Sequence, residues 1–201
     1  MQPAFVYLAS QSPRRRQLLE QLSVRHELLL PQADENAEAL EQELPGEAPA
    51  AYVRRVTLLK LDAALLRRRQ RSLAPAPVLC ADTTVALGRT MFAKPLDGGD
   101  ACRMLAALAG RSHRVLTAVA LGSARRRELV VSESRVWFAP LSQRQIEAYV
   151  AGGEPMGKAG AYAVQGRAAA FIREIRGSYS GIMGLPMFET AQLLAAFGFR
   201  S

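Results

Sequence analysis

Hydroxyl and guanidinium side chains crowd one short segment near the beginning of this sequence, the stretch SQSPRRR at residues 10–16. A helix N-terminus presents free N–H groups and the positive end of its dipole, and both favour a phosphate. Arg14 and Arg15 can add forked, charge-assisted hydrogen bonds to phosphate oxygens. A single arginine is more often a solvated surface residue, but three in a row oppose the helix dipole. We therefore expect an anion to bind here.

Other residues that could do chemistry follow apolar runs. Asp82 comes directly after the apolar strand pattern 78–81, at the carboxyl edge where open α/β sheets bind ligands. A carboxylate there can hold a hard cation or position an attacking water, although a lone Asp more commonly caps a turn. Glu35, just past another predicted strand, is a second acidic group. Lys94 is held extended by Pro95, which suits either an ammonium aimed at a phosphate or a solvated lysine on an edge strand.

A second glycine-rich region covers residues 154–166. Within it Lys158 can reach a phosphate and the amide of Gln165 can read a base edge, although the glycines are also typical of simple turns. His113 is one of two histidines, and neither has the spacing of metal ligands. The sequence therefore gives no support for a zinc site or a histidine nucleophile.

Alternating elements must position these residues. The segment 5–9 predicts a strand, and Pro13 with Ser12 before it begins a helix that a serine side chain caps. The rest of the chain predicts strands at 26–30, at 78–81 with a continuation at 85–88, at 115–121, at 129–138 and at 170–175. It predicts four further helices: one that begins at Pro49, one at 100–109, one that runs from the capping box Ser142/Gln145 to residue 150, and one that begins at Pro186. The helix from Pro49 repeats apolar residues at Tyr52, Val56, Leu59, Ala63 and Leu66. The mixture of crossovers and a hairpin predicts an α/β or α+β fold with a mixed sheet.

Composition limits the class of protein. A chain of 201 residues with 49% hydrophobic content can bury an ordinary core, and we expect one domain over 1–201, or two tightly joined lobes. The net charge of +8 and the pI near 10.2 favour an anionic partner. The arginine clusters at 67–71 and 125–127 are more typical of solvated faces. Because basic and aromatic residues do not alternate, nucleic acid is a weaker candidate than a small phosphate ligand.

The cysteines and the hydropathy pattern bear on location. Cys80 and Cys102 form neither a CxxC motif nor a disulfide framework, and Cys80 lies in an apolar strand pattern typical of a core. The sequence shows no secretory signal and no run as long as a membrane span. We expect a cytoplasmic protein without a membrane partner.

An ordered series of motifs resembles one known family. The stretches LASQSPRR, ADTTV, AKP, GRSHRVLTAV, KAGAYAVQG and GLP, spread from Leu8 to about Phe197, resemble the Maf family of nucleoside-triphosphate pyrophosphatases. Each motif is short, but the ordered set is specific. The resemblance implies a curved mixed sheet flanked by helices, similar to that of inosine triphosphatase, with two lobes around a nucleotide cleft. It also implies hydrolysis of a nucleoside triphosphate to the monophosphate and pyrophosphate, and a possible homodimer.

The resemblance also implies roles for single residues. Asp82 matches the proton acceptor, Glu35 matches an acidic position implicated with a divalent cation, Mg²⁺ or Mn²⁺, and Asp82 is a second candidate ligand. Ser10, Arg14, Arg15 and Lys94 match phosphate-binding positions, and Lys158 lies in a matching loop. Cations and a carboxylate are what the expulsion of pyrophosphate requires. Gly157 departs from the family, which usually has Asp there.

Three positions indicate which nucleotide base the protein would select. Arg14, Thr83 and Gln165 resemble the branch that acts on dTTP and UTP, whereas a branch that acts on 7-methyl-GTP tends to have Trp, Gln and Glu. An amide both donates and accepts, as a pyrimidine edge requires. We expect a dTTP/UTP pyrophosphatase that removes non-standard or excess nucleotides. The alternatives are a 7-methyl-GTP pyrophosphatase and a nucleotide-binding regulator of septum formation without turnover.

Overall fold

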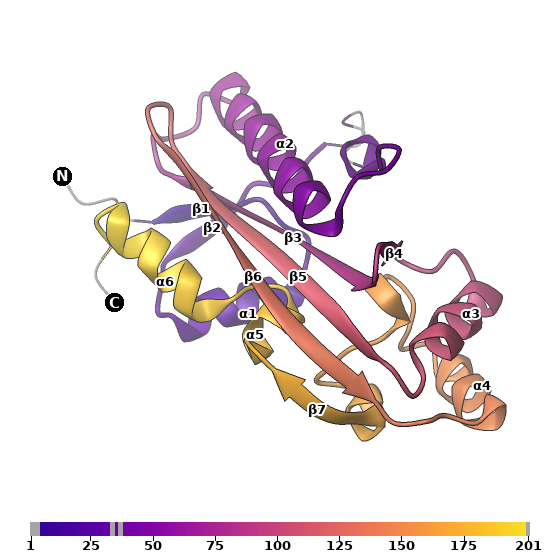
Figure 1. The fold of residues 1–201 in the computed structure, drawn as a ribbon. Coiled ribbons are helices and arrows are strands. Elements are labelled where there is room, and N and C mark those ends of the chain that lie inside the picture. Colours follow the sequence, from indigo (N-terminus) through magenta and orange to yellow (C-terminus); the bar gives the residue numbers. More distant parts are fainter. Residues whose placement is uncertain (1–4, 33–34, 36–37, 200–201) are drawn as a thin grey trace.

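The computed structural model, which describes residues 5–32, 35 and 38–199, has a seven-stranded mixed sheet with helices on both faces (Figure 1). The strand order is β2-β1-β3-β5-β6-β7, and β4 pairs with β3 off this path. Pairing is parallel among β2, β1 and β3 and antiparallel elsewhere. The predicted fold class is confirmed. The strands are β1 (Val6–Leu8), β2 (His26–Leu28), β3 (Val78–Leu87), β4 (Thr90–Phe92), β5 (Ser112–Gly122), β6 (Arg127–Phe138) and β7 (Ile172–Arg176).

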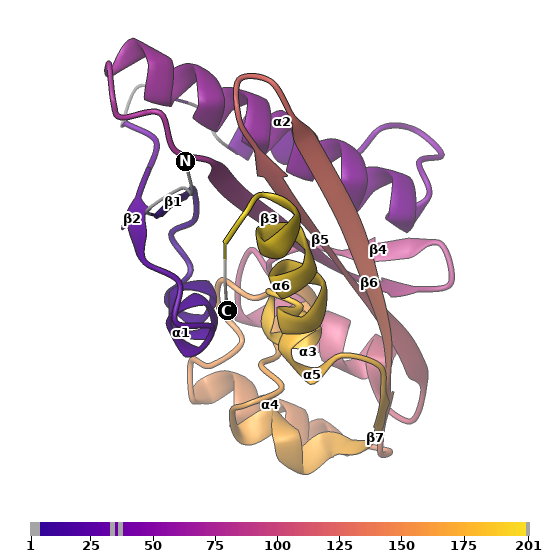
Figure 2. The same cartoon turned by 90° about the vertical axis from the view of Figure 1, so that its left-hand side faces the viewer.

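The helices form layers around this sheet. The long helix α2 packs on one face of β3 and β5, and α5 and α6 pack on the opposite face, as Figure 2 shows. Helices α3 and α4 contact each other at one end of the sheet. None of the described helices is both long and apolar enough to span a membrane. Their bounds are α1 (Pro13–Gln21), α2 (Pro49–Gln70), α3 (Gly98–Leu108), α4 (Gln143–Ala151), α5 (Tyr179–Met183) and α6 (Met187–Ala196), with 3₁₀ helices η1 (Glu38–Glu41), η2 (Ala159–Ala161) and η3 (Arg167–Phe171).

Strand β3 is longer than the sequence analysis predicted, and this changes the setting of Asp82. It pairs with β5 continuously from Val78 to Ala86, so Asp82 lies in the middle of a strand and not after its end. On its other edge β3 pairs with β1 only through Val78 and Leu79, and with β4 only from Val85. No described strand pairs with the stretch between these two partners. A ligand can therefore approach Asp82 from the side of the sheet.

The apolar repeat of helix α2 is buried only at its beginning. Tyr52 and Val56 are buried as predicted, but Leu59 and Leu66 are exposed, and the later buried positions of the helix include Leu61 and Ala64. The prediction of a solvated arginine cluster at its C-terminal end is wrong for Arg67, which is buried. The reason is tertiary: Arg67 donates to the carbonyl of Leu29 and to the carboxylate of Glu35.

Other boundaries differ at their ends. The predicted strand at 26–30 ends at Leu28, and the strand predicted at 170–175 begins only at Ile172, because a 3₁₀ helix occupies 167–171. The short helix α5 was not predicted. The Ser12 cap with Pro13 after it and the Ser142/Gln145 capping box are confirmed.

The core has separate clusters on either side of the middle of the sheet. One lies at the α3 and α4 end and includes Val85, Leu105 and Tyr149, with Tyr162 from the glycine-rich segment. Another joins β1, α1 and α6. Two further clusters lie between α2 and the sheet, and Cys80, predicted to be core, is fully buried in one of them.

Candidate active site

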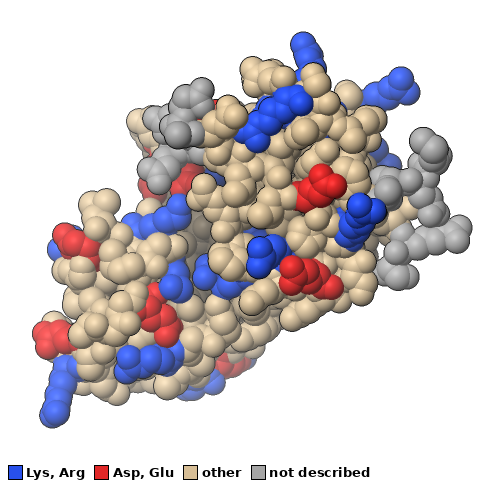
Figure 3. Space-filling model, turned by 180° about the vertical axis from the view of Figure 1, so that it is seen from behind, with Lys and Arg blue, Asp and Glu red and all other residues tan. Residues whose placement is uncertain are grey.

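A cavity of about 900 Å³ opens beside the exposed edge of β3. Its walls come from the loop before α1, the inner face of α2, the middle of β3, the residues after β4 and the glycine-rich segment near 157–164. This volume suits a small-molecule ligand. Figure 3 shows basic side chains around a hollow on the back of the molecule, with acidic side chains between them. The residues predicted to carry the chemistry that line it are Ser10, Arg14, Arg15, Glu35, Asp82, Thr83, Lys94 and Lys158.

The loop before α1 has the predicted form of an anion site. The Ser12 hydroxyl caps α1 by accepting a hydrogen bond from the backbone N–H of Arg15 (3.4 Å), and Pro13 follows at the start of the helix. Ser10 Oγ in turn accepts the N–H of Ser12 (3.2 Å). The first turn of α1 contains no acidic residue to neutralise the dipole. The cavity therefore borders an uncompensated positive helix end.

Arg15 joins three separate parts of the chain at the cavity wall. Its Nε donates to the carbonyl of Gly184 (2.8 Å), Nη1 to Ser10 Oγ (3.3 Å) and Nη2 to Thr83 Oγ1 (3.3 Å). Gly184 has a φ of 115°, which disfavours any residue with a side chain at this point. Burial lowers the pKa of Arg15, and the negative charge of Asp82 raises it again in part. Arg15 has five N–H donors, so two remain for an anion.

Thr83 is the partner that fixes Arg15 from the sheet. Its hydroxyl also lies 2.9 Å from Thr117 Oγ1, and Thr117 donates to the carbonyl of Gly181 (2.7 Å). The Thr83 side chain therefore belongs to a chain of hydrogen bonds that runs from β3 across β5 to α5. These contacts place Thr83 beside Arg15, and its role in choosing a base stays a prediction.

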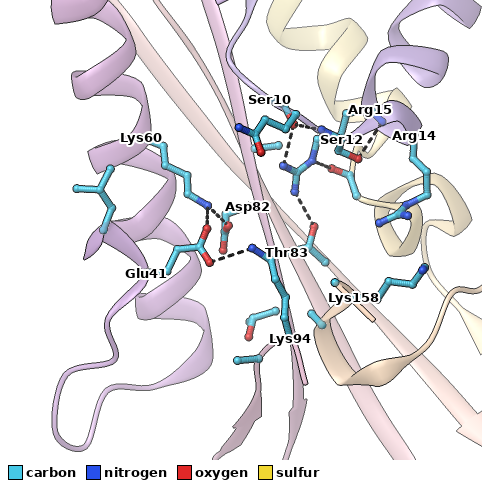
Figure 4. A pocket seen from close by; sticks show the side chains of 18 of the residues that line it. Ser10, Ser12, Arg14, Arg15, Glu41, Lys60, Asp82, Thr83, Lys94 and Lys158 are labelled. Atoms are coloured by element: carbon cyan, nitrogen blue, oxygen red, sulfur yellow. Dashed lines mark hydrogen bonds and ion pairs between the residues drawn. The ribbon is translucent and has the colours of Figure 1, made fainter. Parts of the chain in front are cut away.

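Arg14 and Lys158 lie together on the other side of the cavity (Figure 4). Arg14 Nε donates to the carbonyl of Met183 (3.4 Å). Lys158 Nζ donates to the carbonyl oxygens of Glu154 and Met156. Burial and the nearby charge of Arg14 lower the pKa of Lys158. Neither cation has a carboxylate partner within ion-pair distance in the described structure. Two cations that repel each other favour an anion between them.

Asp82 belongs to a chain of alternating charges. Lys60 Nζ lies 2.6 Å from Asp82 Oδ1 and 2.6 Å from Glu41 Oε1, and Lys94 Nζ lies 3.5 Å from Glu41 Oε2 (Figure 4). Burial disfavours the Glu41 carboxylate, but the two ammonium groups outweigh it and hold its pKa below the usual value. Asp82 is 7% exposed. Lys60 therefore separates two carboxylates that face the same cavity.

Lys60 and Glu41 were missed by the sequence analysis. Lys60 is four residues after Val56 and four before Ala64, so it interrupts the buried stripe of α2. A lone lysine on a buried stripe is unusual and could have marked it as functional. Glu41 carries no such signal, because it lies in a polar connection whose course depends on tertiary contacts.

Two predicted site residues lie apart from the charge chain. Glu35 borders the cavity, but its carboxylate binds Arg67 (2.5 Å) and Arg71 (3.5 Å), and hydrogen bonds from Arg67 lower its pKa to about 2. Gln165 is exposed and is not part of the cavity wall, although its neighbour Val164 is. The structure thus brings Asp82, Lys94 and the arginines together, and places Gln165 outside the cavity.

The donor set fits a divalent cation only if phosphate supplies further ligands. Among the described residues no group of three or more His, Cys, Asp or Glu side chains could enclose a metal ion. Mg²⁺ usually binds through one or two carboxylates together with substrate phosphates. Asp82 and Glu41 are two carboxylates in such a position, with the Lys60 ammonium between them.

Comparisons with known proteins match nearly the whole of this chain. The family model described as Maf-like protein matches residues 5–197. A protein of Albidiferax ferrireducens named dTTP/UTP pyrophosphatase is 72% identical, covering 98% of each chain. Proteins of the same name from Polaromonas sp. and Burkholderia pseudomallei are 63% and 59% identical, covering 98% and 96% of this chain and 97% and 93% of theirs.

A solved structure, that of the Staphylococcus aureus Ham1 protein, has a TM-score of 0.38 and 11% identity, and covers 67% of this chain and 71% of that one. This likeness is too distant to support an argument. The family match and the identity to the curated relatives both extend over nearly the whole chain. This chain therefore belongs to the family of Maf-like proteins.

Proposed function

We propose that this protein hydrolyses dTTP and UTP to the nucleoside monophosphate and pyrophosphate. The observation that carries the proposal is the cavity beside β3, where Asp82 lies among cationic side chains from four parts of the chain. The name of relatives up to 72% identical, dTTP/UTP pyrophosphatase, supports the same reaction. Such an enzyme removes non-standard or excess nucleotides.

The reaction breaks the bond between the α-phosphorus and the oxygen that bridges to the β-phosphate. A water molecule supplies the new oxygen on the α-phosphorus, and in our proposal Asp82 accepts the proton that this water loses. The electron pair of the broken bond leaves with pyrophosphate. Arg14, Arg15 and Lys158 neutralise the charge on the leaving phosphates, together with the free N–H groups of α1.

The charge chain around Asp82 has two roles in this mechanism. Lys60 holds the carboxylate in one orientation by its contact at 2.6 Å. Of the two lysines in this charge chain, Lys94 is more exposed than Lys60. Its contact with Glu41, at 3.5 Å, is longer than the Lys60 contacts at 2.6 Å. A triphosphate can therefore draw Lys94 away from Glu41 at small cost, because exposed ion pairs contribute little.

We infer that the cation is Mg²⁺ or Mn²⁺ that enters with the nucleotide. Asp82 and Glu41 would hold it beside the phosphates, and Glu35 would contribute if it exchanged Arg67 for the metal. Bound there, the cation would neutralise charge on phosphate oxygens. The proposal is supported by the chemistry of the two carboxylates, which are ligands that hard cations prefer.

Preference for a pyrimidine base is assigned to Arg14, Thr83 and Gln165. Arg14 and Thr83 line the cavity, whereas Gln165 would have to move with its loop to reach a base.

We propose that the protein acts in the cytoplasm, since Cys80 and Cys102 are both free thiols, and that it forms a homodimer. Chromatography with light scattering tests the homodimer.

The function is tested by release of pyrophosphate from dTTP, UTP, CTP, 7-methyl-GTP and the purine triphosphates, with and without Mg²⁺ or Mn²⁺. Release from dTTP and UTP is expected. Preference for 7-methyl-GTP would support the proposed hydrolysis to pyrophosphate but overturn the assignment of dTTP and UTP as substrates. Binding without release from any nucleotide would favour a regulator. In the same assay Asp82→Asn should lose turnover while it still binds dTTP, and full turnover by the folded variant would remove Asp82 from its role.

A further inference from the structure

The segment 154–168 forms a loop whose two ends meet. It begins three residues after α4 and ends in the first turn of η3. Along it Lys158, Tyr162 and Val164 line the cavity, and Gln165 is exposed outside the cavity. The loop therefore carries two of the residues assigned to substrate binding, and its position decides whether they can reach a nucleotide.

One carboxylate closes this loop at its base. Glu154 Oε1 accepts the hydroxyl of Tyr149 (2.9 Å) and the N–H of Ala168 (3.4 Å), and Oε2 accepts the N–H of Arg167 (2.9 Å). Burial disfavours the charged form, but these hydrogen bonds outweigh it and lower the pKa of Glu154. The backbone carbonyl of the same residue accepts a hydrogen bond from Lys158 Nζ. Glu154, the first residue of the loop, thus contacts both the last residues of the loop and its lysine.

A glycine makes room for this carboxylate. A Cβ on Gly166 would collide with Glu154 Oε1. Gly166 has a φ of −101°, so an alanine could adopt its backbone conformation, but only if the end of the Glu154 side chain moved aside. Gly166 directly follows Gln165, so the carboxylate also fixes the backbone next to that amide.

The middle of the loop is strained and depends on contacts elsewhere. Gly160 and Ala161 both have positive φ angles, 68° and 60°, and for a buried alanine this conformation is unfavourable. Gly160 N–H donates to the carbonyl of Ala93 (3.2 Å), and Tyr162 OH is 2.8 Å from His113 Nε2. These contacts hold the middle of the loop against the sheet, and Glu154 holds its base.

We propose that Glu154 is a positioning residue, whose carboxylate holds the base of the loop and so places Lys158 for binding of the nucleoside triphosphate. It touches no substrate and acts through the loop. This inference rests on the proposed function for its substrate, but the closure of the loop by Glu154 can be measured without any turnover.

The test compares Glu154→Gln with Glu147→Gln. Glu147 is an exposed glutamate of α4 whose carboxylate, among the described residues, is hydrogen-bonded only by Gln143, so it undergoes the same chemical change away from the loop. A glutamine at 154 keeps one acceptor oxygen but turns an N–H toward a backbone donor. Gly166→Ala is a second variant that displaces the carboxylate without changing it. Steady-state kinetics with dTTP and hydrogen exchange over 155–166 are measured for each.

For Glu154→Gln and Gly166→Ala we expect faster hydrogen exchange across 155–166 and a KM for dTTP raised about tenfold, the lower end of the effect of losing a hydrogen bond to a charged group. Turnover at saturating dTTP should fall by a smaller factor than KM rises, since Asp82 and Lys60 are untouched and Lys158 is one of three cations assigned to the leaving phosphates. Glu147→Gln should match the parent protein.

Two results would overturn the proposal. One is unchanged hydrogen exchange in both variants, which would show that Glu154 does not close the loop. The other is faster exchange with an unchanged KM, which would show that the loop position does not matter for binding. If the parent protein releases no pyrophosphate, the proposed function fails, and the Kd of a non-hydrolysable dTTP analogue then replaces KM in judging Glu154.

Discussion

Replacement of Lys60 by methionine tests the electrostatic design of the site. The variant keeps the length of the side chain but removes the ammonium that lies 2.6 Å from both Asp82 Oδ1 and Glu41 Oε1. Because both oxygens contact one nitrogen, they are separated by no more than about 5.2 Å. Without Lys60, two carboxylates of like charge face each other across this distance.

The size of the effect follows from the attraction that is lost. The repulsion between the two carboxylates is present in the parent protein as well, so the change in Lys60→Met is the loss of an ammonium at 2.6 Å from each of them. An opposite charge this close lowers the pKa of a carboxylate by about 1–3 units. Without Lys60 the carboxylate pair should therefore retain a proton to a pH about 2 units higher than in the parent protein, which corresponds to about 3 kcal/mol.

The assay is the pH dependence of kcat/KM for dTTP. If Asp82 must be ionised to accept a proton from water, the acid limb of the profile should move upward by about 2 pH units in Lys60→Met. Lys94→Met is the matched control: it also removes a lysine from the charge chain, but one that contacts only Glu41, so its acid limb should move less. An acid limb that stays in place in Lys60→Met would refute the electrostatic role of Lys60 and the basic role of Asp82 together.

Three further predictions concern stability, base preference and metal. Burial lowers the pKa of His113 from 6.5 to about 4, so the unfolded chain binds more protons than the folded protein between pH 6.5 and 4. The free energy of unfolding should therefore fall as the pH is lowered, by about 2 kcal/mol between pH 7 and 5. Urea unfolding should show this pH dependence reduced in His113→Gln and kept in His26→Gln; equal curves for all three proteins would contradict it. Gln165→Glu should lower kcat/KM for dTTP and UTP by about tenfold, the effect of losing a bidentate base contact, and lower it less for 7-methyl-GTP; a uniform change across nucleotides would exclude base selection. EDTA should abolish pyrophosphate release and added Mg²⁺ or Mn²⁺ should restore it, whereas full activity in EDTA would exclude the cation.

The parts of the site that depend on local sequence were predictable. Ser12 and Pro13 determine where α1 begins, because capping and the missing proline N–H act within one turn of helix. The same holds for the capping box of α4. The start of α1 and its cap could therefore be located from the seven consecutive residues 10–16, whereas anion binding by this loop stays a prediction.

The parts that depend on distant contacts were not predictable. The sequence places Arg15 beside Arg14 at the helix start, but nothing local indicates that it binds Thr83 and the carbonyl of Gly184. The continuation of β3 through Asp82 depends on its pairing with β5, which overrides the polar residues in the middle of the strand. The buried face of α2 was predicted correctly at Tyr52 and Val56 and wrongly at Leu59 and Leu66, which are apolar yet exposed, because an apolar repeat alone does not say which residues meet the sheet.

The contacts of Arg14 and Arg15 with the carbonyls of Met183 and Gly184 join residues 169 positions apart. Synthesis proceeds from the N-terminus, so the loop before α1 leaves the ribosome while residues 183–184 have yet to be made. A nascent chain can build the strand, loop and helix around Ser12, but it lacks the carbonyls that orient both guanidinium groups. This wall of the cavity therefore assembles only after residues 183–184 have been made, and chains that end before them carry the loop without the contacts that orient its arginines.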